Sequence, residues 1–165
     1  MVPATKVIER KNDKRMDELE AAMVANLPAV DCPVRHIFSK GMYMREIFMP
    51  AGSLITSKIH KTEHPYTISK GKVAVCIDSG EWVEHEAPYT GITRPGTRRL
   101  LYIIEDCTWT CYHRYNGIKG SENELDEVGQ QKIVDKIEKR IIEKHINIAL
   151  ENIKNKKIWL GQQQQ

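Results

Sequence analysis

No apolar run in the sequence approaches the roughly 20 residues that a membrane-spanning helix needs. The first residues, Met-Val-Pro-Ala-Thr-Lys, contain no apolar segment of the kind that a secretory signal carries. The net charge of +3 is too small to indicate nucleic-acid binding by itself. Together these observations favour a globular protein of the cytoplasm with neither a membrane nor a nucleic acid as partner.

The four cysteines include no C-x-x-C pair. Cys107 and Cys111 lie four apart in a stretch with the pattern of a strand, which separates their Cα atoms by roughly 13 Å. A disulfide needs Cα atoms within about 7 Å of each other. The sequence therefore predicts reduced thiols, as in a cytoplasmic protein.

The chain also lacks the strand–helix alternation of a parallel α/β sheet. From Val34 to Arg114, apolar residues recur instead with a period of two, and glycine or proline turns follow at short intervals. This pattern predicts an all-β sandwich or barrel over residues 34–115. The predicted strands cover residues 34–38, 42–49, 53–60, 64–70, 72–78, 81–86, 90–94, 98–105 and 107–114.

Helical patterns flank this β region on both sides. Within residues 1–33, apolar residues from Met16 to Leu27 recur at helical spacing, which predicts a helix after a loose arm. From about Glu124 to Lys157 there is no proline, and the isoleucines form two stripes. We expect a long amphipathic helix over residues 121–158 that covers the barrel or forms the seam of a homodimer. The glutamine-rich end, residues 159–165, is predicted to be disordered.

The stretch between Gly52 and Gly71 carries the strongest motif. Its spacing resembles the first signature of the cupin superfamily, G-x5-H-x-H-x3/4-E-x6-G, with these two glycines at its ends. Lys58 occupies the place of the first ligand histidine, His60 that of the second, and His64 that of the glutamate. The resemblance implies an all-β cupin barrel, or jelly roll, with metal-binding residues at this corner.

The second cupin signature, G-x5-P-x-G-x2-H-x3-N, is matched less completely. Arg99 stands at its histidine position and Arg94 at its proline position. His113, in the last predicted strand, offers a further imidazole. With His60 and His64 it could form a three-histidine site for Fe, Mn, Ni, Cu or Zn. The other histidines, His36, His85 and His145, are interpreted as hydrogen-bonded or surface residues.

Positive charge gathers around the same corner. Strand alternation predicts that Lys58 and His60 share one face, and the cupin frame implies that this face and Arg99 look into the barrel. Arginine suits bidentate binding of carboxylate or phosphate, so an anionic ligand is expected there. Lys61 and Arg98 are interpreted as solvated turn residues. The predicted ligand-binding set is Lys58, His60, His64, Arg99, Tyr66 and Tyr102.

The segment from Leu19 through His113 also resembles a group of small single-domain cupins found in tailed phages and prophages. The residues that carry this resemblance are Leu27–Pro33, Met49–Gly52, His60–His64, Ala87-Pro88, Pro95-Gly96, Tyr102–Asp106 and Trp109. The group has no biochemical function to transfer, and its members commonly have histidine where this chain has Lys58.

Four functions are open at this point. The first is a barrel that binds an anionic small molecule, such as a nucleotide; in a phage this could sequester a host signalling nucleotide. The second is a metal-dependent enzyme of the dioxygenase or isomerase type that uses His60, His64 and His113. The third is a metal-free acid–base enzyme resembling sugar-nucleotide epimerases. The fourth is a phage structural or assembly protein.

Overall fold

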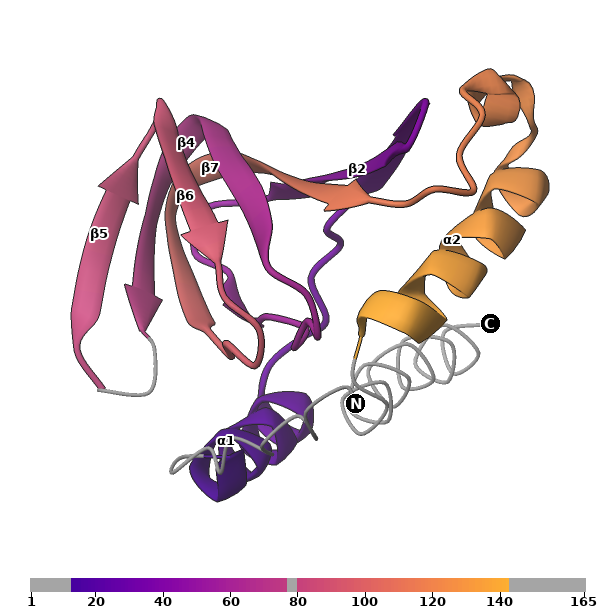
Figure 1. Ribbon diagram of the computed structural model, residues 1–165. Coiled ribbons are helices and arrows are strands. Elements are labelled where there is room, and N and C mark those ends of the chain that lie inside the picture. Colours follow the sequence, from indigo (N-terminus) through magenta and orange to yellow (C-terminus); the bar gives the residue numbers. More distant parts are fainter. Residues whose placement is uncertain (1–12, 77–79, 143–165) are drawn as a thin grey trace, which may run out of the picture.

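The computed structural model describes residues 13–76 and 80–142, and one seven-stranded antiparallel sheet dominates them (Figure 1). A helix precedes this sheet along the chain and another follows it. The elements are α1 (Asp13–Asn26), β1 (Val34–Ser39), β2 (Met42–Met49), β3 (Leu54–Thr56), β4 (His64–Cys76), β5 (Trp82–Glu86), β6 (Tyr89–Thr93), β7 (Leu100–Arg114), the short 3-10 helix η1 (Ser121–Glu124) and α2 (Glu127–Ile141).

Two long strands, β4 and β7, organise the sheet by pairing with each other along most of their length. The other edge of each of these two strands pairs with two shorter strands, one after the other. The first part of β4 pairs with β6 and its second part with β5, while β7 pairs first with β3 and then with β2. The hydrogen-bonded order is β1-β2-β7-β4-β5, and no ladder joins β1 to β5 within the described chain. The structure thus confirms the predicted β region as one antiparallel sheet, without showing a closed barrel.

Gly71 lies at an irregularity that both long strands share. The register between β4 and β7 shifts on either side of it, from Lys70 to Val73. Its φ of 87° is left-handed, and an added Cβ would stand 2.1 Å from the carbonyl oxygen of Asp106. Only glycine allows this approach, so Gly71 permits a bulge inside a continuous strand.

This bulge explains why the structure has fewer strands than predicted. Residues 64–70 and 72–78 were expected as two strands that Lys70-Gly71 separates, but one strand, β4, crosses that position. Residues 98–105 and 107–114 likewise form the single strand β7. A glycine at a bulge and a glycine at a turn look alike in sequence, because both need a positive φ.

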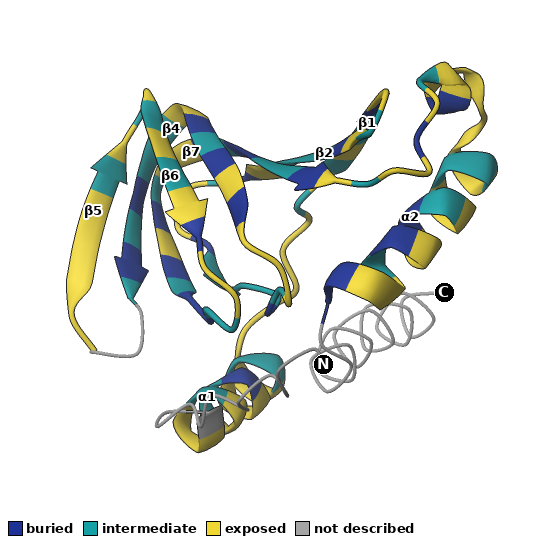
Figure 2. Cartoon of the chain, in the orientation of Figure 1, coloured by how far each residue is buried: buried dark blue, intermediate teal, exposed yellow. Residues whose placement is uncertain are grey.

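One face of the bent sheet carries the main hydrophobic core. Figure 2 shows buried and exposed residues alternating along β4 and β7, as the two-residue period requires. The buried members include Ile68, Val73, Ile103 and Trp109. Tyr66 stacks on Trp109 with ring centroids 4.3 Å apart. Tyr66 lies two residues after His64 on β4, so its ring connects the apolar core to the part of the strand that carries this histidine.

The helix α2 packs its apolar stripe on the β1–β2 end of the sheet. Val134 and Ile137 of α2 form a second core cluster with Phe38 and Tyr43. The side chain of Asp126 caps the helix by accepting a hydrogen bond from the Gly129 amide at 2.8 Å.

Within the described residues, the helix predicted over residues 121–158 is not one continuous element. The 3-10 helix η1 precedes α2, and the backbone of Ile142 is extended, which ends α2 at Ile141. Ile142 instead forms an isolated bridge with His60. The rest of the predicted helix, the predicted tail and the predicted arm over residues 1–12 lie outside the described residues.

The helix α1 is fastened to the sheet by Arg98, which corrects the expectation that this arginine is solvated. The Arg98 side chain is 2% exposed. It pairs with Glu20 at 3.0 Å and with Asp17 at 2.8 Å. A buried guanidinium requires such partners, and carboxylates from a distant helix could not be recognised from the sequence around Arg98.

The two described helices contain no segment long and apolar enough to cross a bilayer.

Candidate metal centre

Three histidines from distant parts of the chain meet on the inner face of the sheet. One ligand nitrogen from each of His60, His64 and His113 lies within 4.8 Å of those from the other two. The ring centroids of His64 lie 4.3 Å from those of both His60 and His113, and the latter two are 5.1 Å apart. His64 and His113 are buried. The three-histidine cluster predicted from the sequence is therefore present.

Separate elements position each imidazole. His64 is the first residue of β4, and His113 is the next-to-last residue of β7, close to the point where β4 meets β7. His60 lies in the loop between β3 and β4, where its carbonyl oxygen accepts a hydrogen bond from the Gly96 amide at 2.9 Å. The end of α2 secures the same loop, because the Lys61 amide donates to the Ile141 carbonyl at 2.7 Å.

Burial keeps these imidazoles neutral. The pKa of His60 is lowered to about 2, chiefly by burial and in addition by the neighbouring His64 and His113. Burial also lowers the pKa of His113 to about 3, with contributions from His64 and Arg45. The pKa of His64 is lowered by burial, against a hydrogen bond with the Thr62 carbonyl that acts in the opposite direction. Each nitrogen that lacks a proton has a lone pair for a metal ion.

The residues present fit a transition-metal ion. The buried Nδ1 of His113 has no hydrogen-bond partner, although a buried polar atom normally has one. The Nδ1 of His64 lies 3.3 Å from the carbonyl oxygen of Thr62, which can hold the proton on Nδ1 and leave Nε2 as the donor atom. Three imidazoles are a donor set typical of zinc, iron, copper or nickel sites with open coordination positions.

Strand alternation does not relate Lys58 to His60 as predicted, because β3 ends at Thr56, although the charge of Lys58 still acts on His60. The ammonium group of Lys58 lies 2.6 Å from the Glu138 carboxylate of α2, and each of these side chains is about a quarter exposed. The charge of Lys58 is therefore offset by a carboxylate 80 positions along the chain.

Arg99 lies inside the fold, as the cupin frame implied. It is 9% exposed, and its guanidinium carbon lies 5.3 Å from the centroid of the Tyr66 ring. Its backbone is fixed to Ser57, whose hydroxyl accepts from the Arg99 amide at 2.9 Å. Tyr66 is buried beside it. The other candidate phenol, Tyr102, is 45% exposed and lies on the opposite face of β7, so it does not join this site.

Sequence reasoning missed two residues of this region. Tyr43 of β2 is fully packed, stacks on His113 at 5.9 Å between ring centroids, and shares a hydrogen bond of 2.8 Å with His36. Arg45, two residues further along β2, acts electrostatically on His60 and His113. Strand alternation could have indicated that Tyr43 and Arg45 lie on one face of β2, opposite Met44. A charged residue such as Arg45 is not expected on a buried face, so this indication was not used.

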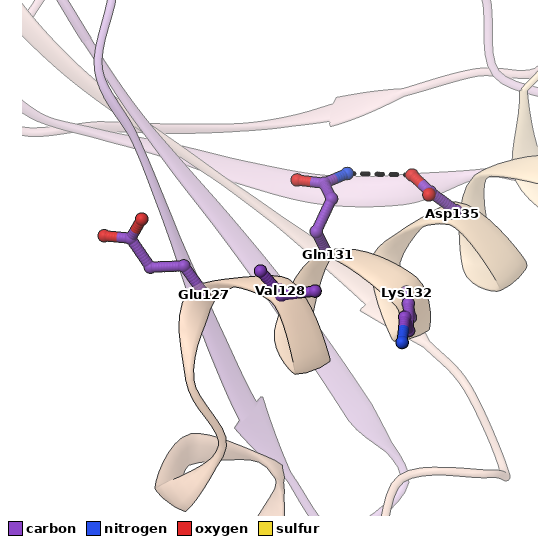
Figure 3. Close-up of a pocket in the computed structure, with 5 residues that line it drawn as sticks. All are labelled: Glu127, Val128, Gln131, Lys132 and Asp135. Carbon is purple, nitrogen blue, oxygen red and sulfur yellow. Dashed lines mark hydrogen bonds between the residues drawn. The ribbon is translucent and has the colours of Figure 1, made fainter.

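A hollow on the surface of α2 lies apart from the histidines (Figure 3). All five residues that line it come from the first turns of this one helix, and all are exposed. The only interaction among them that Figure 3 draws is the hydrogen bond from Gln131 to Asp135 at 2.8 Å. Because no other described element faces it, this hollow is not a candidate site.

Comparison with known proteins gives likenesses of structure alone. No family model matches the chain, and no curated protein does. A cupin family protein with a double-stranded β-helix fold from Methanocaldococcus jannaschii is 12% identical, with a TM-score of 0.44 over 55% of this chain and 86% of that one. A cupin-2 domain protein from Shewanella frigidimarina is 7% identical, with a TM-score of 0.42 over 59% and 92%. A DMSP lyase from Ruegeria pomeroyi is 13% identical, with a TM-score of 0.45 over 52% and 48%. At these values the likenesses carry no inference about activity or ligand.

Proposed function

We propose that this protein is a metal-dependent enzyme of the cupin type, whose transition-metal ion is held by His60, His64 and His113. The convergence of three neutral imidazoles within 4.8 Å is the observation that carries this proposal. Three protein ligands leave coordination positions for a small ligand and for water. When bound, such an ion supplies Lewis acidity and orients the ligand on it.

The surrounding residues support the ligand set. The Thr62 carbonyl fixes the orientation of His64, and Tyr43 packs flat against His113. Partners of this kind hold a ligating imidazole in place and so preserve metal affinity. The loop that carries His60 is secured from two sides, by Gly96 and by Ile141, so the third ligand is positioned before any ion binds.

A metal-free acid–base enzyme has less support. Such chemistry needs a proton donor and acceptor poised near neutral pH, whereas the pKa of His60 is lowered to about 2 by burial first and neighbouring charges second. The pKa of Tyr66 is raised to about 12, chiefly by burial. Lys58, the expected cationic partner, already pairs with Glu138.

The other hypotheses from the sequence stay predictions. They are the dioxygenase or isomerase reaction type, the nucleotide ligand, the phage context, a role in assembly, and the homodimer. Of these, the homodimer is the simplest to measure, by light scattering on the full chain.

Metal analysis of the full chain without a polyhistidine tag tests the proposed function. We expect about one Fe, Mn, Ni, Cu or Zn ion per chain by mass spectrometry, and ligand-field absorption bands when Co²⁺ is added to metal-depleted protein. His64→Ala and His113→Gln should each weaken Co²⁺ binding by at least about 100-fold. His85→Gln is the matched control, because His85 stacks on Tyr89 outside the cluster. Wild-type protein that binds no ion at micromolar Co²⁺ would exclude the proposal.

A further inference from the structure

Among the residues that the structure describes, no carboxylate neutralises the buried guanidinium group of Arg99. The side groups that act on its charge are Tyr66, Cys111 and Tyr89, and no acid is among them. Both buried acidic residues of the described chain are engaged elsewhere: Glu20 pairs with Arg98, and Glu122 binds backbone amides near Gly120. Burial of a charge without a counter-charge is strongly unfavourable, so a buried charge normally has a partner.

The side chains that act on Arg99 are phenols and a thiol rather than carboxylates. Tyr66 lies under the guanidinium plane, and Tyr89 approaches Tyr66 with ring centroids 6.0 Å apart. This environment holds Arg99 in place and leaves its charge uncompensated.

A second guanidinium faces the same interior from β2. Arg45 lies opposite Cys111 in the β2–β7 register, and Tyr66 lies opposite Cys111 in the β4–β7 register. The charges of Arg45 and Arg99 both act on the Cys111 thiol. No ion pair joins either guanidinium to a carboxylate in residues 13–76 and 80–142. Two like charges therefore converge on one small region.

This region adjoins the three histidines. Arg99 contacts Tyr66, which follows His64 by two residues on the buried face of β4. Arg45 follows Tyr43 by two residues on β2, and Tyr43 stacks on His113. A divalent ion held by the neutral imidazoles would add to the positive charge. An anion that enters the site would balance this charge.

We propose that Arg99, with Arg45 across from it, forms an oxyanion subsite that binds the carboxylate or phosphate group of the small ligand beside the three histidines. The planar guanidinium can donate two parallel hydrogen bonds to one oxyanion, which fixes the orientation of the ligand. The inference rests on the proposed function for the position of the ligand next to a metal ion. The subsite itself consists of this chain's own cations and can be tested without the ion.

Calorimetric titration of the metal-depleted full chain with malonate, and separately with inorganic phosphate, is the test. We expect saturable binding of at least one anion, weakened roughly 10- to 150-fold by Arg99→Met. Arg99→Lys keeps the charge but loses the planar fork, so it should restore binding only in part. Arg94→Met is the matched control: Arg94 is exposed on the neighbouring turn, and its replacement should leave binding unchanged.

The outcomes separate this inference from the proposed function. Binding of malonate alone identifies a carboxylate ligand, binding of phosphate alone a phosphate ligand, and loss of either with Arg99→Met supports the subsite. If wild-type protein binds neither anion, or if the folded Arg99→Met and Arg99→Lys variants bind as tightly as wild type, the subsite is refuted. Should Arg99→Met not fold by circular dichroism, Arg99→Lys and Arg45→Met decide the matter by the same comparison. Failure to bind Co²⁺ would refute the metal centre alone and leave an anion site intact.

Discussion

Replacing Glu20 should detach α1 from the sheet, although Glu20 lies far along the chain from its partner. The Glu20 side chain is 7% exposed and the Arg98 side chain 2% exposed, and they meet at 3.0 Å. Glu20→Gln would remove the buried carboxylate and leave the exposed Asp17 as the remaining carboxylate at 2.8 Å from the guanidinium. Removal of one partner from a buried pair destabilises a protein by about 3–5 kcal/mol. Because Asp17 remains, we expect about 2–4 kcal/mol for this variant.

Urea unfolding and thermal unfolding would measure this effect. For a chain of this size, a loss of about 3 kcal/mol corresponds to a Tm lower by about 6–12 °C. Asp17→Asn is the matched control: Asp17 contacts the same guanidinium but is 68% exposed, so it should cost no more than about 1 kcal/mol. The reasoning fails if Glu20→Gln unfolds within about 0.5 kcal/mol of wild type, or if both variants lose the same amount.

Three further predictions concern the histidines, the bulge and the end of α2. Since burial holds the pKa values of His60 and His113 at about 2 and 3, the unfolded chain, whose histidines titrate near 6.5, binds more protons at mildly acidic pH. These groups should therefore not affect the unfolding free energy of metal-depleted protein above about pH 7, and should lower it as the pH decreases below about 6.5. If the unfolding free energy of a His60→Gln variant has the same slope against pH as wild type between pH 7.5 and 5.5, this prediction is wrong. Gly71→Ala should destabilise by about 2–4 kcal/mol in urea, whereas Gly52→Ala, which also has a positive φ but no atom within 4 Å of the added Cβ, should cost only about 1 kcal/mol; equal losses would exclude a role for the Asp106 contact. A double-mutant cycle of Lys58→Met and Glu138→Leu should give a coupling of about 1–2 kcal/mol, because the pair is only about a quarter exposed, and additive effects would show that the contact does not stabilise the fold.

Local pattern was sufficient for much of the sheet and for the histidines. Alternation along residues 42–49 predicted β2 with the limits that the structure gives it, because side chains on a half-buried strand alternate between two environments. The resemblance of the stretch from Gly52 to Gly71 to a cupin signature pointed to His60 and His64. His113 followed as the third candidate from its place in the last strand.

Only the tertiary structure decided which charges face the histidines. Lys58 turns to Glu138, Arg98 is buried against α1, and Arg45 reaches the interior from a strand that the motif does not include. Each of these outcomes depends on a partner that is distant in sequence. Periodicity reports which side of an element is buried, but it carries no information about which element lies opposite. Packing between elements therefore determines the partner of a buried cation. Arg98 pairs with carboxylates of this chain, whereas we propose that Arg99 binds an anion from solution.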